Sequence, residues 1–409
     1  MRASEIKLAD SPAGLPWTGL LVLAGAIFLS VTSEVLPTGL LPDMSRGLGV
    51  SESRIGLLVT IFAGVVVVTA APMTALTRRY PRKILVVVVL IGFALSNLLT
   101  AMAPNYEIVI VSRVIGGLAH GLFWAVVGAY AAHLVPKEQL GRAIAITAAG
   151  ASAAFVLGVP LGTALGHALG WRLAFAVTCG AMLLLAVLVA AYLPAVHHIV
   201  HVKTGEIPLP LRRDPSLLAI ILVCSITGVV MAGHNVFFTY IVPYFIGVNG
   251  FPESSVSTLL FVYGGAGAIG LFLAGWVGVR FPRAGLVGAF LAVAASVLMI
   301  GLFPRQAWLV IGALVVFGIA FGGAPAMLQT RLLVVASPRL RDAAAAYFTT
   351  AFNIAIGGGA FIGGHLLDTY GIEVLPFVYV AVALAGVAFI LVSDVVLVRR
   401  SDRTRRVAV

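Results

Sequence analysis

Residues 117–121 read Gly-Leu-Ala-His-Gly, and residues 318–322 read Gly-Ile-Ala-Phe-Gly, 201 positions later. Three further matches keep this offset and this order: Ser51-Glu52-Ser53 with Pro252-Glu253-Ser254, Arg79-Tyr80-Pro81-Arg82 with Arg280-Phe281-Pro282-Arg283, and Gly158 with Gly359. Four ordered matches at one offset indicate an internal repeat. The sequence therefore predicts two similar halves.

The composition places these halves in a membrane. The chain is 61% hydrophobic and 10% charged, with a mean hydropathy of +1.09, whereas soluble domains carry about 25% charged residues. A membrane-spanning helix needs about 20 apolar residues, and the runs here are too long for barrel strands of about 10 residues. We expect an all-α membrane protein with twelve spans at about 17–42, 54–76, 84–103, 108–133, 142–166, 171–193, 215–244, 254–279, 284–303, 307–331, 342–365 and 371–398.

Basic residues predict the orientation, because cytoplasmic loops are enriched in Lys and Arg. With the N-terminus inside, the outer loops hold only Arg46, Arg54, Arg172 and Arg305, and nearly all the other Lys and Arg residues lie inside. Both termini are then cytoplasmic and the two six-span bundles, 1–193 and 215–409, run parallel, joined by a cytoplasmic linker, 194–214. The long first apolar stretch does not fit a cleavable signal peptide. The net charge of +11 is spread over the loops, which argues against a nucleic-acid partner.

Glu34 stands out because it is an acid deep inside the first apolar stretch. A carboxylate at that depth costs several kcal/mol unless it is paired, hydrated or protonated, so such a residue is a functional candidate by default. The alternative is a structural polar contact. Glu34 is eight residues from the outer end of its span and Arg113 about six, which at 1.5 Å per residue is a depth of about 12 Å and about 9 Å.

Three motifs resemble the Major Facilitator Superfamily. The first, the loop at 75–83, follows the family pattern Gly-x-Leu-Ala-Asp-Arg-x-Gly-Arg-Arg/Lys at Arg79, Arg82 and Lys83, but has Arg78 at the aspartate and Pro81 at the glycine. The other two are Arg113 to Gly121, similar to a span-four motif with a buried arginine, and Gly150 with Gly158-Val159-Pro160-Leu161-Gly162, similar to the antiporter signature of span five. With Thr32-x-Glu34-x-x-Pro37 and Gly170-Trp171-Arg172, the chain resembles the twelve-span drug–proton antiporters, in the branch of sugar efflux, arabinose-efflux-like and chloramphenicol-resistance exporters.

This resemblance implies a central cavity between the halves, lined by spans one and four, and suggests roles for the polar residues. Glu34, Arg113 and His120 are the proton-coupling candidates, with Glu34 and Arg113 interacting directly or through water; a permanent ion pair and a packing histidine are the alternatives. We expect substrate contacts from Glu34, Trp124, Asn235 (the repeat counterpart of Glu34), Tyr240, Gln329 and Asn353, although such aromatics also occur in cores and at lipid. Gating is assigned to Arg79, Arg82, Lys83, Gly158, Pro160 and Gly162.

The sequence thus predicts a monomeric secondary transporter of the bacterial inner membrane, exporting a small organic solute, sugar-like or an amphipathic drug, against protons by alternating access. A proton-independent facilitator or importer and a non-transporting solute sensor are the alternatives. No ATP-binding or metalloprotease motif occurs, so an enzyme is not expected. No cofactor or metal is expected either, since His197 and His201 have no acidic or cysteine partner beside them.

Overall fold

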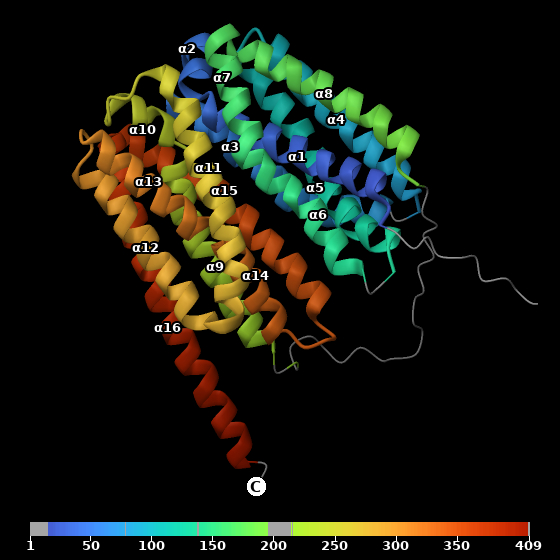
Figure 1. The fold of residues 1–409 in the computed structure, drawn as a ribbon, viewed down its shortest axis with the longest axis vertical. Coiled ribbons are helices and arrows are strands. Elements are labelled where there is room, and N and C mark those ends of the chain that lie inside the picture. The colour runs from blue at the N-terminus through green and yellow to red at the C-terminus, as the bar shows by residue number, and fades with distance from the viewer. Residues whose placement is uncertain (1–14, 78, 137–138, 195–213, 215, 408–409) are drawn as a thin grey trace, which may run out of the picture.

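The computed structural model describes residues 15–77, 79–136, 139–194, 214 and 216–407, and in this part of the chain the regular structure is helical (Figure 1). The helices of the first half are α1 Trp17–Gly39, α2 Leu41–Leu48, α3 Glu52–Thr77, α4 Arg82–Met102, α5 Tyr106–Leu134, α6 Leu140–Ala153, the π-helix η2 Ala154–Gly158, α7 Val159–Leu169 and α8 Trp171–Tyr192. Those of the second half are α9 Leu217–Phe238, α10 Ile241–Gly247, α11 Glu253–Arg280, α12 Pro282–Leu302, α13 Ala307–Gly322, α14 Ala324–Val335, α15 Arg341–Tyr370, the 3-10 turn η4 Ile372–Val374 and α16 Leu375–Val407.

Within the described residues, twelve helical segments are long and apolar enough to cross a membrane, which confirms the expected number of spans. Three of them are interrupted: α6, η2 and α7 form the fifth, α9 and α10 the seventh, and α13 and α14 the tenth. Proline accounts for part of this, because it removes a backbone hydrogen-bond donor: Pro160 follows the π turn and Pro325 opens α14. The chain is a multi-pass membrane protein.

The repeat read from the sequence is reproduced in the packing. A Cβ added to Gly117 would lie 2.9 Å from the Phe62 carbonyl oxygen and 2.9 Å from Val65 Cβ. A Cβ on Gly318 would meet the residues 201 positions further on, with the Tyr263 carbonyl oxygen at 2.6 Å and Ala266 Cβ at 2.7 Å. Small residues let helix backbones approach this closely, so the glycine pair preserves the same helix crossing in both halves.

Three large apolar clusters show where the two halves meet. One is shared, because it joins Leu40, Met44 and Leu58 of the first half to Tyr240 and Tyr263 of the second. The other two lie within a single half each. We call the membrane end with the shared cluster, α2 and α10 the sealed end, and the end where α3 meets α4 and α11 meets α12 the basic end.

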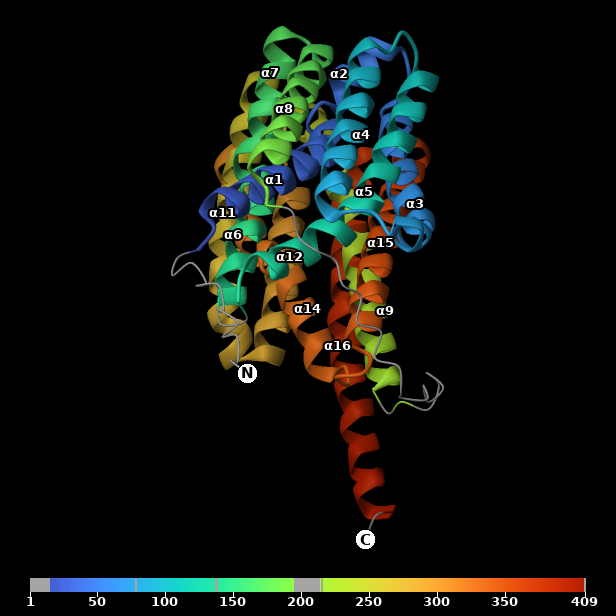
Figure 2. The ribbon, with the colours of Figure 1, turned by 90° about the vertical axis from the view of Figure 1, so that its right-hand side faces the viewer.

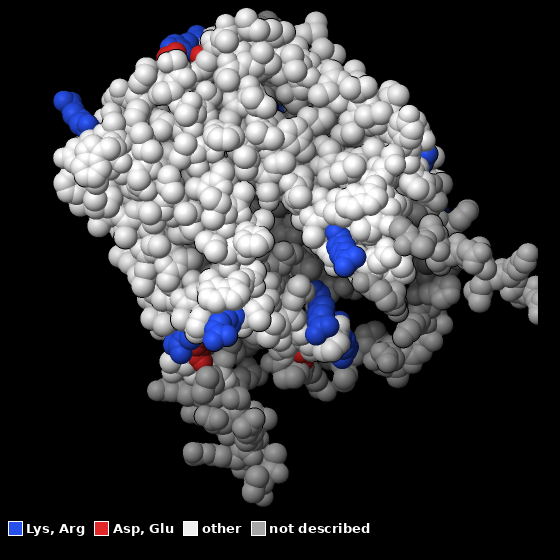
Figure 3. Space-filling model, in the orientation of Figure 1, with Lys and Arg blue, Asp and Glu red and all other residues white. Residues whose placement is uncertain are grey.

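The halves separate toward the basic end. The last described residues of α16 lie beyond this end, away from α2 and α7 (Figure 2). Lys and Arg gather around it, and the surface between the halves is hollowed there (Figure 3). The structure is therefore closed between the halves at the sealed end and open at the basic end.

Two helix pairs form the seam between the halves. On one side α3 packs against α15, and the Thr60 hydroxyl donates to the Gly357 carbonyl at 2.9 Å. On the other side η2 and α7 pack against α11, where the backbone of Phe155 lies against Gly264. Nearly all of the expected linker, with His197 and His201, lies outside the described residues.

Candidate functional site

Glu34 lies in the last third of α1, three residues before Pro37, which lies inside the helix. Its carboxylate is partly buried, with 18% of the side chain exposed, and Oε2 is 3.6 Å from Nε2 of His120 on α5. An acid on one helix therefore faces an imidazole on another, at a distance that a small side-chain movement would convert into a hydrogen bond. The structure brings Glu34 to His120, a pairing that the sequence alone did not suggest.

Both ring nitrogens of His120 have partners. The Trp124 indole N–H donates to Nε2 at 2.8 Å. Nδ1 lies 3.3 Å from the Ser30 hydroxyl. Because an indole N–H can only donate, Nε2 is an acceptor here, and a neutral ring carries its proton on Nδ1. Trp124 thus occupies the nitrogen that Glu34 faces, and a proton can reach Nε2 only after the indole has moved away.

Arg113 is buried in α5, with 2% of its surface exposed. Its guanidinium donates to the Ser33 carbonyl at 3.3 Å and lies over the Phe175 ring at 5.5 Å, while its Nε has no hydrogen-bond partner within the described part. No ion pair joins it to Glu34 among the described residues. The direct contact, one of the two forms of interaction expected from the sequence, is absent in this conformation.

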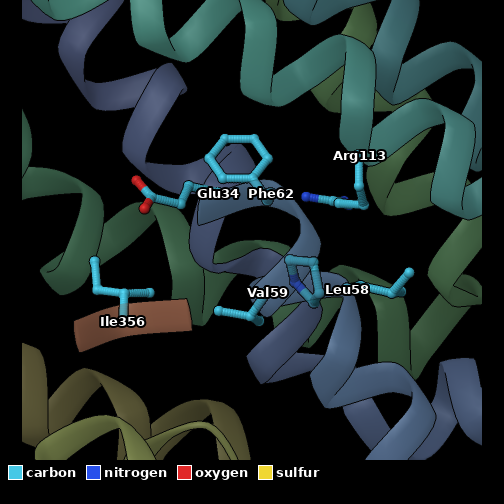
Figure 4. Close-up of a pocket in the computed structure, with 7 residues that line it drawn as sticks. Glu34, Leu58, Val59, Phe62, Arg113 and Ile356 are labelled. Carbon is cyan, nitrogen blue, oxygen red and sulfur yellow. The ribbon is translucent and has the colours of Figure 1, made fainter. Parts of the chain in front are cut away.

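A small cavity lies between these two charged groups. Glu34, Pro37, Leu58, Val59, Phe62, Arg113 and Ile356 line it, and its volume is about 10 Å³. That is close to the space of one water molecule. Figure 4 shows Glu34 and Arg113 on either side of Phe62, with Ile356 reaching in from α15 of the other half. The cavity therefore has room for a water molecule beside both charged groups, at the level where the halves meet.

The remaining polar candidates do not converge on this cavity. The Asn235 and Asn353 amides donate to carbonyls of their own helices, at Met231 and Thr349, both at 2.9 Å. Gln329 is exposed on α14. Tyr240 is fully buried in the seam, where its hydroxyl donates to the Ala360 carbonyl at 2.9 Å. In this conformation Tyr240 packs against Gly56 of the first half instead of facing an open cavity.

The glycines of the antiporter-like motif bring the fifth span close to the first. A Cβ on Gly158 would collide with Thr32, and one on Gly162 would lie 2.7 Å from Leu36 Cδ1. Gly158 ends the π turn and Pro160 lies in the first turn of α7. Such turns are frequent at functional positions of helices. The opposite side of this turn contacts α11, so the motif links the Glu34 helix to the seam.

The three basic gating candidates lie at the basic end. Arg79 is exposed in the turn after α3, and Arg82 and Lys83 are half-buried at the start of α4. The corresponding turn of the second half contributes Arg283, whose Nε is 2.9 Å from Asp394 Oδ2, and Asp394 also pairs with Arg331. The second half therefore has an aspartate beside its basic turn, whereas the first half has Arg78 at the aspartate position of the loop motif.

A cluster of charges at the sealed end was not predicted. Arg46 of α2 binds both carboxylate oxygens of Glu253 on α11, at 2.6 and 3.2 Å, and binds Asp43 at 2.8 Å. His167 of α7 lies 3.1 Å from Asp43. Glu253 belongs to one of the matched repeat segments, but the partners of a surface acid cannot be read from an offset. We call these four residues the seam cluster.

The model of the Major Facilitator Superfamily matches the chain at residues 23–359 and 242–407. The chain belongs to this superfamily. The resemblance and the helical fold expected from the sequence are thereby confirmed, and the class is one of transporters, not enzymes.

Relatives in two Helicobacter pylori strains, P12 and G27, are each named "Probable sugar efflux transporter" and are 29% identical to this chain. The alignments cover 87% of this chain and 90% of each relative. Among solved structures, a bacterial homolog of the human lysosomal transporter Spinster, crystallised inward-facing and occupied, superposes with a TM-score of 0.69 at 16% identity over 94% of this chain and 96% of that one. The human organic anion transporter MFSD10 gives 0.67 at 14% identity, over 92% and 99%. At these identities the two structures support the fold alone.

Proposed function

We propose that this protein exports a small organic solute in exchange for protons, by alternating access of a site between its two halves. The solute class to test first is a neutral sugar or sugar-like molecule, with amphipathic drugs second. The relatives named as sugar efflux transporters support this order. So does the lining of the cavity, in which five of the seven residues are uncharged, because a neutral polar solute needs few charged partners.

The observation that carries the proposal is the pair Glu34 and His120, which lies beside a small cavity that reaches the seam. A buried carboxylate next to an imidazole can change its protonation state as its surroundings change, since burial and nearby charges act on it in opposite directions. Arg113 stabilises the ionised acid when water connects the two. Ile356 of the second half lines the same cavity, so movement of the halves alters the surroundings of Glu34.

The proton steps follow from the hydrogen bonds. Glu34 takes up a proton when the cavity opens toward the outside and loses it when the cavity opens toward the cytoplasm, which we assign to the basic end from the positive-inside rule. Trp124 holds Nε2 of His120, so the two groups exchange a proton only after the indole moves. A solute that binds the Trp124 N–H would release Nε2 and thereby couple its own arrival to proton movement.

A facilitator that ignores protons is the second candidate. It is favoured by one observation, the absence of a direct Glu34–Arg113 ion pair, because an acid without that partner can also serve as a hydrogen-bonding group for the solute.

The experiment measures the internal pH of sealed vesicles containing purified protein while sugars and small drugs are added outside. Wild type is compared with Glu34→Gln and with Glu107→Gln, which removes an exposed acid at the start of α5 and serves as the control. Proton movement triggered by a solute in wild type and in the control, but not in Glu34→Gln, supports antiport. Solute flux without proton movement in all three proteins would make this chain a facilitator.

A further inference from the structure

His167 connects the two halves at the sealed end. It lies in the last turn of α7, and only 12% of its side chain is exposed. Nδ1 is 3.0 Å from the backbone carbonyl oxygen of Glu253, on α11 of the other half. Nε2 is 3.1 Å from Oδ2 of Asp43, on α2 of its own half.

Both of these partners are acceptors. A backbone carbonyl cannot donate, and an ionised carboxylate cannot donate either. The Nε2–Oδ2 contact is not aligned as a hydrogen bond. With a proton on Nε2 of a charged ring the contact is an attraction between charges, and without that proton it is a repulsion between lone pairs. A neutral imidazole has one N–H and leaves its other nitrogen facing an oxygen at 3.0 or 3.1 Å. Only the doubly protonated ring satisfies both contacts.

Asp43 supplies a permanent negative charge for this arrangement. Burial raises the pKa of its carboxyl group, but the nearby charge of His167 and the hydrogen bond and charge of Arg46 outweigh burial, and the pKa lies below its usual range. Asp43 therefore stays ionised at any pH at which the protein would work.

The other charged groups around His167 have partners of their own, so Asp43 remains the carboxylate that faces the ring. On α11, the Glu253 carboxylate is bound to Arg46. On α8, Arg172 donates to the Ala103 carbonyl and lies over Trp171. On α1, Glu34 is the one titratable residue within the helix, and it contacts His120. On α2, Arg46 neutralises the charges of Asp43 and Glu253 in part, so Asp43 is the carboxylate that His167 faces.

We propose that His167 is a second proton-binding site, separate from Glu34, which is occupied when the halves are closed at the sealed end. Opening this end separates α7 from α11 and removes the Glu253 carbonyl from Nδ1. The open form then holds the proton less well than the closed form. By linkage, a falling pH favours closure of the sealed end, by up to tenfold per pH unit for one proton.

The consequence differs from proton coupling at Glu34. With the sealed end facing outward, an acidic exterior holds the exporter open toward the cytoplasm, ready to collect solute. The proton at His167 acts on the equilibrium between two conformations, so its effect does not require that the protein transports protons.

The first test is the protonation of the ring itself. Protein with ¹⁵N-labelled histidine is studied by NMR in lipid at pH 7.5, and the His167 signals are identified by their loss in His167→Gln. We expect both nitrogens to be protonated, although a free imidazole with a pKa of about 6.5 is roughly nine-tenths neutral at this pH. A neutral His167 ring at pH 7.5 would overturn the proposal.

The second test measures the conformation. Cys179 and Cys224 are replaced by alanine, and spin labels are attached at Glu107→Cys and Arg305→Cys, exposed positions at the sealed end of each half. Distances are recorded in nanodiscs from pH 5.5 to 8.5. In wild type the closed fraction should rise as pH falls, whereas His167→Gln should flatten this dependence.

Two control variants separate the possible causes. His365→Gln removes an exposed histidine near the same end of α15 and should behave as wild type. Glu34→Gln should keep the pH dependence even if proton transport is lost, which distinguishes failure of this inference from failure of the proposed function. A response that persists in His167→Gln and vanishes in Glu34→Gln would assign the linkage to Glu34 and refute the second site.

Discussion

Gly264 offers a direct way to weaken the sealed end. It lies on α11, and a Cβ added there would meet the backbone of the π turn in the other half, with the Phe155 carbonyl carbon at 2.6 Å and Val156 Cα at 3.0 Å. Ordinary contact begins at 3.4 Å. The Phe155 carbonyl oxygen lies closer still, so Gly264→Ala requires the two halves to part by at least about 0.8 Å at this point. Because all three obstacles are backbone atoms, no side-chain rotation relieves them.

Overpacking of this kind costs about 1 to 3 kcal/mol. The cost falls on the conformation closed at the sealed end, because the contact joins the halves and is lost when they separate. A difference of 1 to 3 kcal/mol corresponds to a shift of roughly 5- to 150-fold between two conformations. We expect Gly264→Ala to move the closed fraction by an amount in this range toward the form that is open at the sealed end.

The spin-label pair at positions 107 and 305 measures this shift, and thermal unfolding in detergent checks that each half remains folded. Gly265→Ala is the matched control, because a Cβ at the next residue has nothing within 4 Å. If the two variants give the same distance distribution as wild type, the seam is too compliant for the packing argument. If both shift equally, the effect comes from helix propensity and not from the seam.

Two further outcomes can be measured with the same preparations. Trp124→Phe keeps an aromatic ring but removes the donor to His120, so we expect the proton leak into vesicles without solute to rise several-fold. The control is Trp308→Phe, which changes an exposed tryptophan on α13. An unchanged leak in Trp124→Phe would show that Trp124 does not lie on the proton path. Asp43 has a pKa below its usual range, so its contribution to closure is complete above about pH 3.9, the value of a free aspartate, and is lost as pH falls through the lowered pKa. The closed fraction should therefore decline again in strong acid, and Asp43→Asn should reduce it at neutral pH. A closed fraction that keeps rising with added acid until the protein unfolds would contradict this assignment.

Much of the architecture could be predicted from the sequence because it depends on long apolar runs and on one repeated offset. Gly117 and Gly318 show why this works: an offset preserved in sequence preserves a helix crossing, and a glycine is required where two backbones meet. Glu34 could be recognised as a functional candidate from its depth alone, since few buried acids lack a role. The pairing of Glu34 with His120 depends on the rotation of α5 about its axis, which sequence spacing does not determine.

The contacts of the seam cluster could not be predicted from the sequence, for a different reason. Arg46 and Glu253 are 207 positions apart. Arg46 lies in the short helix α2 and Glu253 is the first residue of α11, and at neither position does periodicity indicate which way the side chain points. The repeat can also preserve a contact while its chemistry changes. Tyr130 donates to the Pro194 carbonyl in the first half, and its counterpart 201 positions on, Arg331, pairs with Asp394 in the second. The offset predicts where two helices touch, but not which groups join them.

The division of the core bears on how the chain is synthesised. Two of the large apolar clusters belong to one half each, so the first bundle can bury most of its own core before the ribosome has made the second. Domains of this kind generally fold as units in the order of their synthesis. The shared cluster would then form last, when two preformed bundles dock. Under the proposed alternating access, the surface that completes assembly is the same surface that separates in each transport cycle, so selection for firm assembly is limited by the need for motion.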